Sequence, residues 1–168
     1  AAAAAVAGEL DVLNRRRQET EDSILADAEG RVRAGGLAET HKILILGDEK
    51  WHRGIIGIVA SRLKEIFHRP VVLFSYDDGC AFGSGRSIPG FSLIDCLEEA
   101  RPFFLSYGGH RQAVGCTLRR ESVPAFKEAM NRRVRGGATA GRAGAFSAGT
   151  WGGPKQWQLR ITTMYRFI

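Results

Sequence analysis

The chain has 168 residues, 44% of them hydrophobic and 25% charged, which is enough length and apolar content to bury the core of one domain. Its 24 basic residues exceed its 18 acidic ones, and the formal net charge of +6 mildly favours an anionic partner, of which nucleic acid is the usual one, although many basic proteins bind nothing anionic. No apolar run approaches the ~20 residues that span a bilayer. Three cysteines without a C-x-x-C pair argue against a disulfide framework or a zinc site and indicate free thiols.

The first predicted elements are a long helix, a strand and a second helix. Apolar residues at helical spacing predict a helix from Glu9 to Arg33. Its other faces are charged, which is typical of a helix that connects two domains. The apolar run from Lys42 to Gly47 predicts a buried strand, and an apolar stripe predicts a helix from Ile55 to Phe67.

A hairpin follows this second helix. Pro70 ends the helix and opens a strand from Val71 to Ser75. Asp77-Asp78-Gly79 predicts a tight turn that returns the chain as an antiparallel strand from Cys80 to Gly85. The remaining expected elements are a helix from Ser92 to Ala100, a glycine loop at Tyr107-Gly108-Gly109-His110, a strand from Ala113 to Leu118 and a helix from Ser122 to Val134.

This alternation predicts the α/β class, with a mixed β-sheet flanked by helices and preceded by a long connector helix. The expected parts are a connector over residues 1–36, a domain over 37–135 and a tail over 136–168. The tail is rich in Gly and Ala and has no period. We therefore expect it to be a disordered linker or an aberrant end.

Two glycine-containing segments could bind an anion. Gly83-Ser84-Gly85-Arg86-Ser87 offers two hydroxyls and a guanidinium, donors that suit a phosphate or a carboxylate. The same residues fit the plain end of a hairpin strand equally well. Gly108-Gly109-His110 can form a nest of backbone amides beside an imidazole, or simply a turn.

A third segment begins the helix at Ile55. His52 lies in the loop Trp51-His52-Arg53-Gly54, where free N–H groups and the helix dipole favour an anion. The other reading of this loop is a capped helix start with Trp51 in the core. No motif for nucleotide, zinc-protease or serine-hydrolase chemistry is present.

Four stretches together resemble a known family. WHRGIIGIVASRL, RPVVLFS, GSGRSIPGFSL and YGGH, in this order and spacing, are similar to the DHHA1 domain of bacterial RecJ-type exonucleases. The last motif alone would indicate only the wider DHH phosphoesterase superfamily. The resemblance covers about Leu10 to Val134, so we expect the chain to be part of a longer protein.

The resemblance implies an enzyme that degrades single-stranded DNA from its 5′ end in recombination and repair. Two Mn or Mg ions would activate water, held by a DHH domain. This chain has no Asp-His-His, so we expect it to bind no metal and to be inactive alone. Its expected partners are single-stranded DNA and two domains of the same protein, the DHH domain and an oligonucleotide-binding domain. The expected location is the bacterial cytoplasm.

The resemblance also implies which residues face the DNA. Ser84 and Arg86 of the S-G-R motif would grip phosphate, together with Gly108, Gly109 and His110. His110 is the candidate catalytic residue, and it would act by contacting the substrate phosphate. Further binding residues are expected at Gly85, Ser87 and His52, and Arg119 is expected on an outer face away from the DNA.

Two other functions remain open. One is a different DHH-family phosphoesterase, acting on short oligonucleotides or cyclic dinucleotides. The other is a nucleic-acid-binding module without catalysis. A phosphoesterase of short substrates would prefer oligonucleotides of a few residues, whereas the exonuclease would act on long single strands. A binding module would stay inactive after a DHH domain is added, whereas the exonuclease would regain activity.

Overall fold

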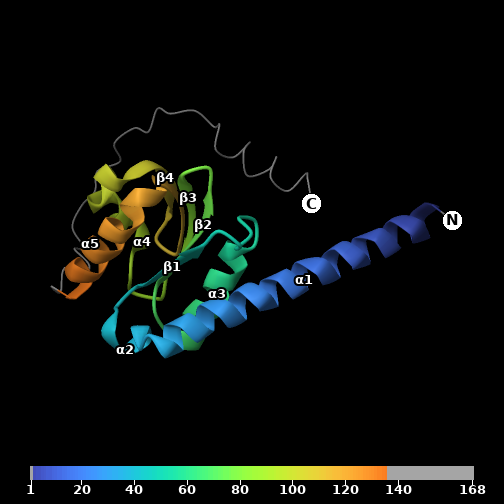
Figure 1. The fold of residues 1–168 in the computed structure, drawn as a ribbon, viewed down its shortest axis with the longest axis horizontal. Coiled ribbons are helices and arrows are strands. Elements are labelled where there is room, and N and C mark those ends of the chain that lie inside the picture. The colour runs from blue at the N-terminus through green and yellow to red at the C-terminus, as the bar shows by residue number, and fades with distance from the viewer. Residues whose placement is uncertain (1, 136–168) are drawn as a thin grey trace. The chain divides into compact units, whose positions relative to one another are not determined.

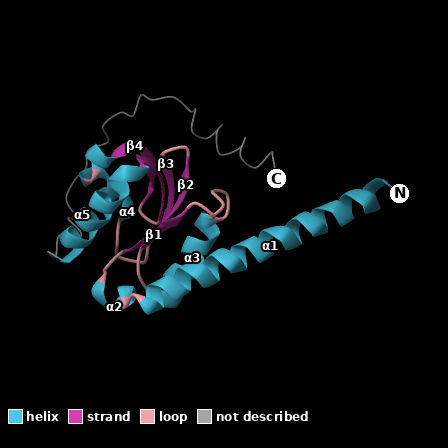
Figure 2. Cartoon of the chain, in the orientation of Figure 1, coloured by secondary structure: helices cyan, strands magenta, loops and turns pink. Residues whose placement is uncertain are grey.

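The computed structural model describes residues 2–135 (Figure 1). Helices and strands alternate along this range, as Figure 2 shows by colour. The elements are α1 (Ala2–Ala34), α2 (Leu37–Thr40), β1 (Leu44–Asp48), α3 (Ile56–Phe67), β2 (Val71–Asp77), β3 (Cys80–Arg86), α4 (Leu93–Glu99), β4 (Phe104–His110), β5 (Ala113–Arg119) and α5 (Val123–Arg135), with 3-10 turns at Arg101–Phe103 and Arg120–Ser122.

The strands form one mixed sheet in the order β1-β2-β3-β5-β4, which confirms the expected fold class. β1 and β2 are parallel, so α3 serves as their crossover, and the other pairs are antiparallel. The turn between β2 and β3 has positive φ at Asp78 (44°) and Gly79 (70°). These angles fit the two-residue hairpin turn that the sequence predicts.

One expectation about the strands is wrong. The sequence predicts a glycine loop at residues 107–110, but this segment is the second half of β4. β4 pairs with β5 from Phe104↔Leu118 to His110↔Ala113. The turn between them is Arg111-Gln112, and these residues carry no strong turn signal.

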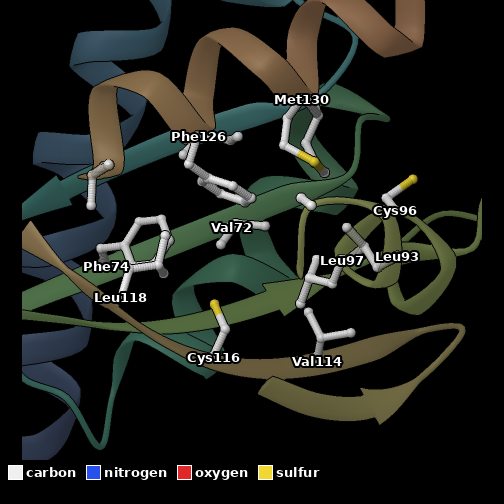
Figure 3. Packing of buried hydrophobic residues seen from close by; sticks show 14 of the residues in the cluster. Val72, Phe74, Leu93, Cys96, Leu97, Val114, Cys116, Leu118, Phe126 and Met130 are labelled. Atoms are coloured by element: carbon white, nitrogen blue, oxygen red, sulfur yellow. The ribbon is translucent and has the colours of Figure 1, made fainter. Parts of the chain in front are cut away.

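One face of the sheet is covered by α4 and α5. Phe126 and Met130 of α5 point toward Val72 and Phe74 of β2 (Figure 3). The rings of Phe74 and Phe126 meet edge to face, with centroids 6.1 Å apart. Cys116 is buried on this side, and burial raises the pKa of its thiol to about 12.

The other face is covered only in part. α3 packs its buried residues Ile56, Val59, Ala60 and Leu63 against Leu44, Leu46, Val71 and Leu73 of β1 and β2. Ile24, Leu25, Ala28 and Val32 of α1 complete this second core. Trp51 is also buried there, and its Nε1 donates to Asp27 Oδ2 of α1 (2.9 Å).

The chain divides into two compact units, and α1 crosses the boundary between them. The unit with the sheet begins at Arg15, and residues 2–14 of α1 lie outside it. From Arg15 on, α1 also contributes to a core. Its role as a connector between domains remains a prediction. In the first half, Val6, Leu10, Val12 and Leu13 are exposed. The domain boundary at residue 36 remains a prediction.

The expected tail lies outside the described residues. None of the described helices is both long and apolar enough to cross a membrane.

Candidate nucleic-acid interface

Alternation along β3 separates its residues onto two faces. Phe82, Ser84 and Arg86 lie on the face that α3 partly covers, and all three are half-buried. Gly83 and Gly85 lie on the opposite face, in the core. A Cβ at Gly85 would come within 2.7 Å of the Val114 side chain.

Two of the expected binding residues are therefore used by the fold. Gly85 is buried and is glycine because the core leaves no room for a side chain. Ser87 is 2% exposed, and its hydroxyl donates to the carbonyl of Phe91 (2.7 Å). Neither residue presents a side chain to a ligand.

Ser84 and Arg86 form one unit with the first turn of α3. Arg86 Nη1 donates to Ser84 Oγ (3.2 Å) and to the Gly85 carbonyl (2.8 Å). A Cβ at Gly57 would lie 2.9 Å from Ser84 Oγ and 3.1 Å from Arg86 Nη2. Gly57 thus allows α3 to lie directly against this pair, and the guanidinium is held in a defined orientation.

His110 reaches the same face from the edge of the sheet. It pairs with Ala113 of β5, which pairs with Arg86 of β3. Residues paired directly across strands point to the same face. With strands ~4.8 Å apart, the backbones of Arg86 and His110 are about 10 Å from each other. Both side chains therefore leave the same face of the sheet, two strands apart.

Three rows of paired residues make up this surface, which we call the open face. The rows run across β3, β5 and β4, and all nine residues are half-buried or exposed. They are Phe82–Thr117–Ser106, Ser84–Gly115–Gly108 and Arg86–Ala113–His110.

The middle of the open face has no large side chain. A Cβ at Gly108 would meet nothing within 4 Å, and one at Gly115 only the Gly83 carbonyl, at 4.0 Å. Neither glycine has a positive φ, so the backbone requires glycine at neither position. Glycine inside a strand often marks the close approach of a ligand. The surface can accept a flat or extended anion against the backbone.

Gly109, in contrast, has a structural role. Its φ is 135°, and a Cβ would run into the carbonyl oxygen of Ala113. It is required for β4 to end in this hairpin. From the other face, Tyr107 Oη donates to Glu98 Oε2 of α4 (2.6 Å), and this bond raises the pKa of the tyrosine. β4 is thereby tied to α4 behind the open face.

Local hydrogen bonds fix the tautomers of the two candidate site histidines, His52 and His110. Nδ1 of His110 accepts the N–H of Gln112 (3.3 Å), and Nδ1 of His52 accepts the N–H of Gly54 (3.1 Å). In the neutral form each ring therefore carries its proton on Nε2, where it can be donated. The His52 carbonyl also accepts the N–H groups of Ile55 and Ile56.

These bonds support the reading of residues 51–54 as a capped helix start. Trp51 is 3% exposed, and His52 occupies N–H groups that an anion would need. His52 is exposed and makes no hydrogen bond to Ser84, Arg86 or His110. The structure therefore does not join it to the other expected site residues.

Arg119 is not where it was expected. It pairs with Cys80 at the end of β5, which places it on the same face of the sheet as Ser84 and Arg86. It lies one row beyond Phe82 and Thr117. It is unsuitable as a control for binding to this face.

A metal centre does not fit the residues described. Within residues 2–135 no three His, Cys, Asp or Glu side chains are grouped so that they could hold an ion.

The DHHA1 domain family matches residues 40–136, which is more than half of the chain. The chain belongs to the DHHA1 domain family. Its relatives are RecJ exonucleases. The single-stranded-DNA-specific exonuclease RecJ of Bacillus subtilis is 38% identical over 128 residues, which are 75% of this chain and 16% of that protein. The RecJ of Escherichia coli is 38% identical over 143 residues, 77% of this chain and 24% of that protein. The chain thus spans less than a quarter of these relatives.

Solved structures agree with the sequence comparison. The crystal structure of Thermus thermophilus RecJ in complex with Mg²⁺ has a TM-score of 0.67 at 33% identity, over 82% of this chain and 21% of that one. A structure of exonuclease RecJ bound to manganese has a TM-score of 0.68 at 33% identity, over 85% of this chain and 35% of that one. Those larger chains carry the divalent ions.

The structure adds two residues to the candidate site that the sequence does not identify, Gly57 and Gly115. Gly57 in WHRGIIG contacts the Ser84–Arg86 pair, although it reads as an ordinary helix residue. Gly115 aligns with Ser84 and Gly108 only through the register of β5. A glycine in the middle of a predicted strand was the one available signal for it.

Proposed function

We propose that this DHHA1 domain binds the phosphates of single-stranded DNA on its open face, as the substrate-binding part of a RecJ-type 5′-to-3′ exonuclease in recombination and repair. Arg86 and Ser84 bind one phosphate, and His110 donates to it from the opposite side. Gly108 and Gly115 let the strand lie close to the backbone. The protein acts in the bacterial cytoplasm.

One observation carries this proposal. Four of the five residues that the S-G-R and G-G-H motifs of the RecJ resemblance assign to DNA occupy adjacent rows of one face and are half-buried or exposed: Ser84, Arg86, Gly108 and His110. The fifth, Gly109, lies on the opposite face. A guanidinium, a hydroxyl and an imidazole N–H are donors that suit the oxygen atoms of a phosphate, and the glycines between them leave room for it. The net charge of +6 favours the same class of ligand.

Hydrolysis is assigned to a DHH domain outside the described residues. The solved relatives that hold Mg²⁺ or Mn²⁺ are larger chains. The described residues bind and orient the strand, and the oligonucleotide-binding domain of the same protein extends the contact. Water activation by divalent ions belongs to the DHH domain.

Binding of a fluorescent 5′-phosphorylated single strand to the 168-residue chain tests the proposal. Removing one partner of a charge-assisted contact costs about 1.5–3 kcal/mol, so Arg86→Ala should weaken binding by about 10-fold or more. Arg86→Lys keeps the charge but loses the fork, so it should recover only part of the affinity. Arg132→Ala removes the same charge from α5, on the opposite side of the sheet, and should bind as wild type.

The proposal is wrong if Arg86→Ala binds as tightly as Arg132→Ala. Strand length separates the alternative functions. Equal affinity for long strands and for dinucleotides would favour a phosphoesterase of short substrates. Binding that rises with length supports the exonuclease.

A further inference from the structure

We infer that Arg53 is a second phosphate-binding residue, which engages a neighbouring phosphate of the same DNA strand and is held in place by stacking on Phe82. This inference rests on the proposed function, because it extends the path of the strand from the Arg86 row along β3. Arg53 lies in the Trp51–Gly54 loop that the sequence offers as an anion site, but the motifs assign no phosphate contact to Arg53 or to Phe82.

The position of Arg53 follows from the loop before α3. Its guanidinium carbon lies 3.9 Å from the centre of the Phe82 ring, so the planar group is stacked on the aromatic face. Phe82 belongs to the open face, two residues from Ser84 and four from Arg86 on the same strand. At ~3.3 Å per residue, about 13 Å of strand β3 separates Phe82 from Arg86. The Arg53 guanidinium lies over Phe82, whereas the Arg86 guanidinium lies at Ser84, so the two groups follow one another along β3 as contacts to neighbouring phosphates require.

The charge of Arg53 is not neutralised within the described part of the chain. No carboxylate lies within ion-pair distance of it there, and its side chain is exposed. Several other arginines differ in this respect, because a carboxylate partner is present for each of them. They are Arg17, Arg31, Arg33, Arg62, Arg120 and Arg132.

A stacked, unpaired guanidinium suits binding for two reasons. Stacking uses the face of the group and leaves the N–H donors at its edge directed outward. The ring also limits the side-chain freedom that would be lost on binding. A purely structural role, in which Arg53 only covers Phe82, would require neither an unpaired charge nor a position beside the open face.

The salt dependence of binding distinguishes a phosphate contact from a packing contact. Each neutralised phosphate of a single strand contributes about 0.7 to the slope of log affinity against log salt. We therefore measure binding of the 168-residue chain to a 5′-phosphorylated oligothymidylate over a range of salt concentrations, and to a 5′-phosphorylated dinucleotide that occupies only the Arg86 position.

Arg53→Ala should weaken binding of the long strand by about 10-fold and flatten the slope by about 0.7, with dinucleotide affinity unchanged. Arg53→Lys should restore the slope but only part of the affinity, since lysine keeps the charge without the fork. Phe82→Leu keeps the charge and the apolar bulk, and it should weaken the long strand several-fold with the slope intact. Thermal unfolding of each variant is measured alongside, with Arg132→Ala as the control.

Three results overturn the inference. The first is an Arg53→Ala variant whose salt slope equals that of wild type. The second is a loss of affinity that is the same for the dinucleotide as for the long strand. The third is wild-type affinity for Phe82→Leu. If Arg86→Ala also binds DNA as tightly as wild type, the proposed function itself fails. If only the Arg53 variants bind as wild type, the proposed function stands without this second phosphate contact.

Discussion

Gly108 and Gly109 are neighbours in β4, yet they are glycine for different reasons. Gly109 has positive φ and no room for a Cβ beside Ala113, whereas Gly108 has open space above it. The fold needs the first glycine, and by our account the ligand needs the second. Substitution by alanine separates the two roles.

Gly109→Ala should lower the free energy of unfolding by about 2 kcal/mol or more, from the strained φ and the backbone clash. Gly108→Ala should leave that free energy unchanged or raise it by up to about 1 kcal/mol, and it should still weaken DNA binding. Urea unfolding and strand binding measure the two quantities. If Gly108→Ala binds DNA with wild-type affinity, the DNA does not need a glycine at position 108.

Asp48 gives the stability of the domain a defined pH dependence. Its carboxylate accepts the N–H of Lys50 (2.9 Å) and pairs with Arg31 (2.5 Å). The Lys50 N–H first, and then Arg31, lower the pKa of Asp48 from its ordinary value. The carboxylate therefore stabilises the fold above the pKa of the unfolded chain, and this stabilisation is lost as the pH falls through the lower folded pKa.

Asp48→Asn should reduce the free energy of unfolding by about 1 kcal/mol at neutral pH. The difference from wild type should shrink as acid protonates Asp48. Asp11→Asn, at an exposed position of α1, is the control and should show little difference at any pH. Urea unfolding at neutral and acid pH measures both variants, and a difference that is constant with pH would contradict the assignment.

At the scale of elements, the first turn of α3 is fitted to β3 through Gly57. Alanine is favoured over glycine within a helix by about 1 kcal/mol, but a Cβ here would press on Ser84 Oγ and Arg86 Nη2. Gly57→Ala should therefore change the melting temperature little while it weakens DNA binding several-fold, because the fork is displaced.

Gly30→Ala is the matched control for that variant. Gly30 is also within a helix, α1, and a Cβ there would meet nothing within 4 Å. It should raise stability by up to about 1 kcal/mol and leave binding unchanged. Equal binding by the two alanine variants would show that α3 does not position Arg86.

The elements that the sequence predicts are those whose own residues carry a local signal, such as an apolar stripe or a turn dipeptide. The stripe of α3, the apolar run of β1 and the Asp78-Gly79 turn each carry a local signal, and the structure confirms all three. β4 has no such signal, because Ser106, Gly108 and His110 face outward and two adjacent glycines suggest a turn. It is a strand because β5 supplies its partners, and that information is not local.

The site is predictable to a similar extent. Ser84 and Arg86 share a face because a strand alternates, and the same rule places Gly85 on the other face. Ser87 follows the strand, and its hydroxyl is bonded to the Phe91 carbonyl. Alternation alone could have predicted from the sequence that Gly85 faces the core. The stacking of Arg53 on Phe82 could not be predicted, because residues far apart in the chain meet only after α3 has crossed the sheet.

At the scale of the whole molecule, our proposal assigns binding and catalysis to different parts of the protein. The described residues include the open face, which we propose binds phosphate, but no group of three or more His, Cys, Asp or Glu side chains that could hold a metal. We therefore expect the 168-residue chain, incubated with manganese and a 5′-phosphorylated single strand, to bind the strand and release no mononucleotide. Mononucleotide release that stops when EDTA is added would contradict this division.

The central claim is that DNA lies on the open face, and amide chemical shifts measured during titration with a 5′-phosphorylated single strand test it most directly. We predict the largest shifts at residues 82–86, 106–110 and 113–117, with α4 and α5 little changed. Shifts centred on α5, or shifts absent from β3, β4 and β5 at saturation, would contradict the account.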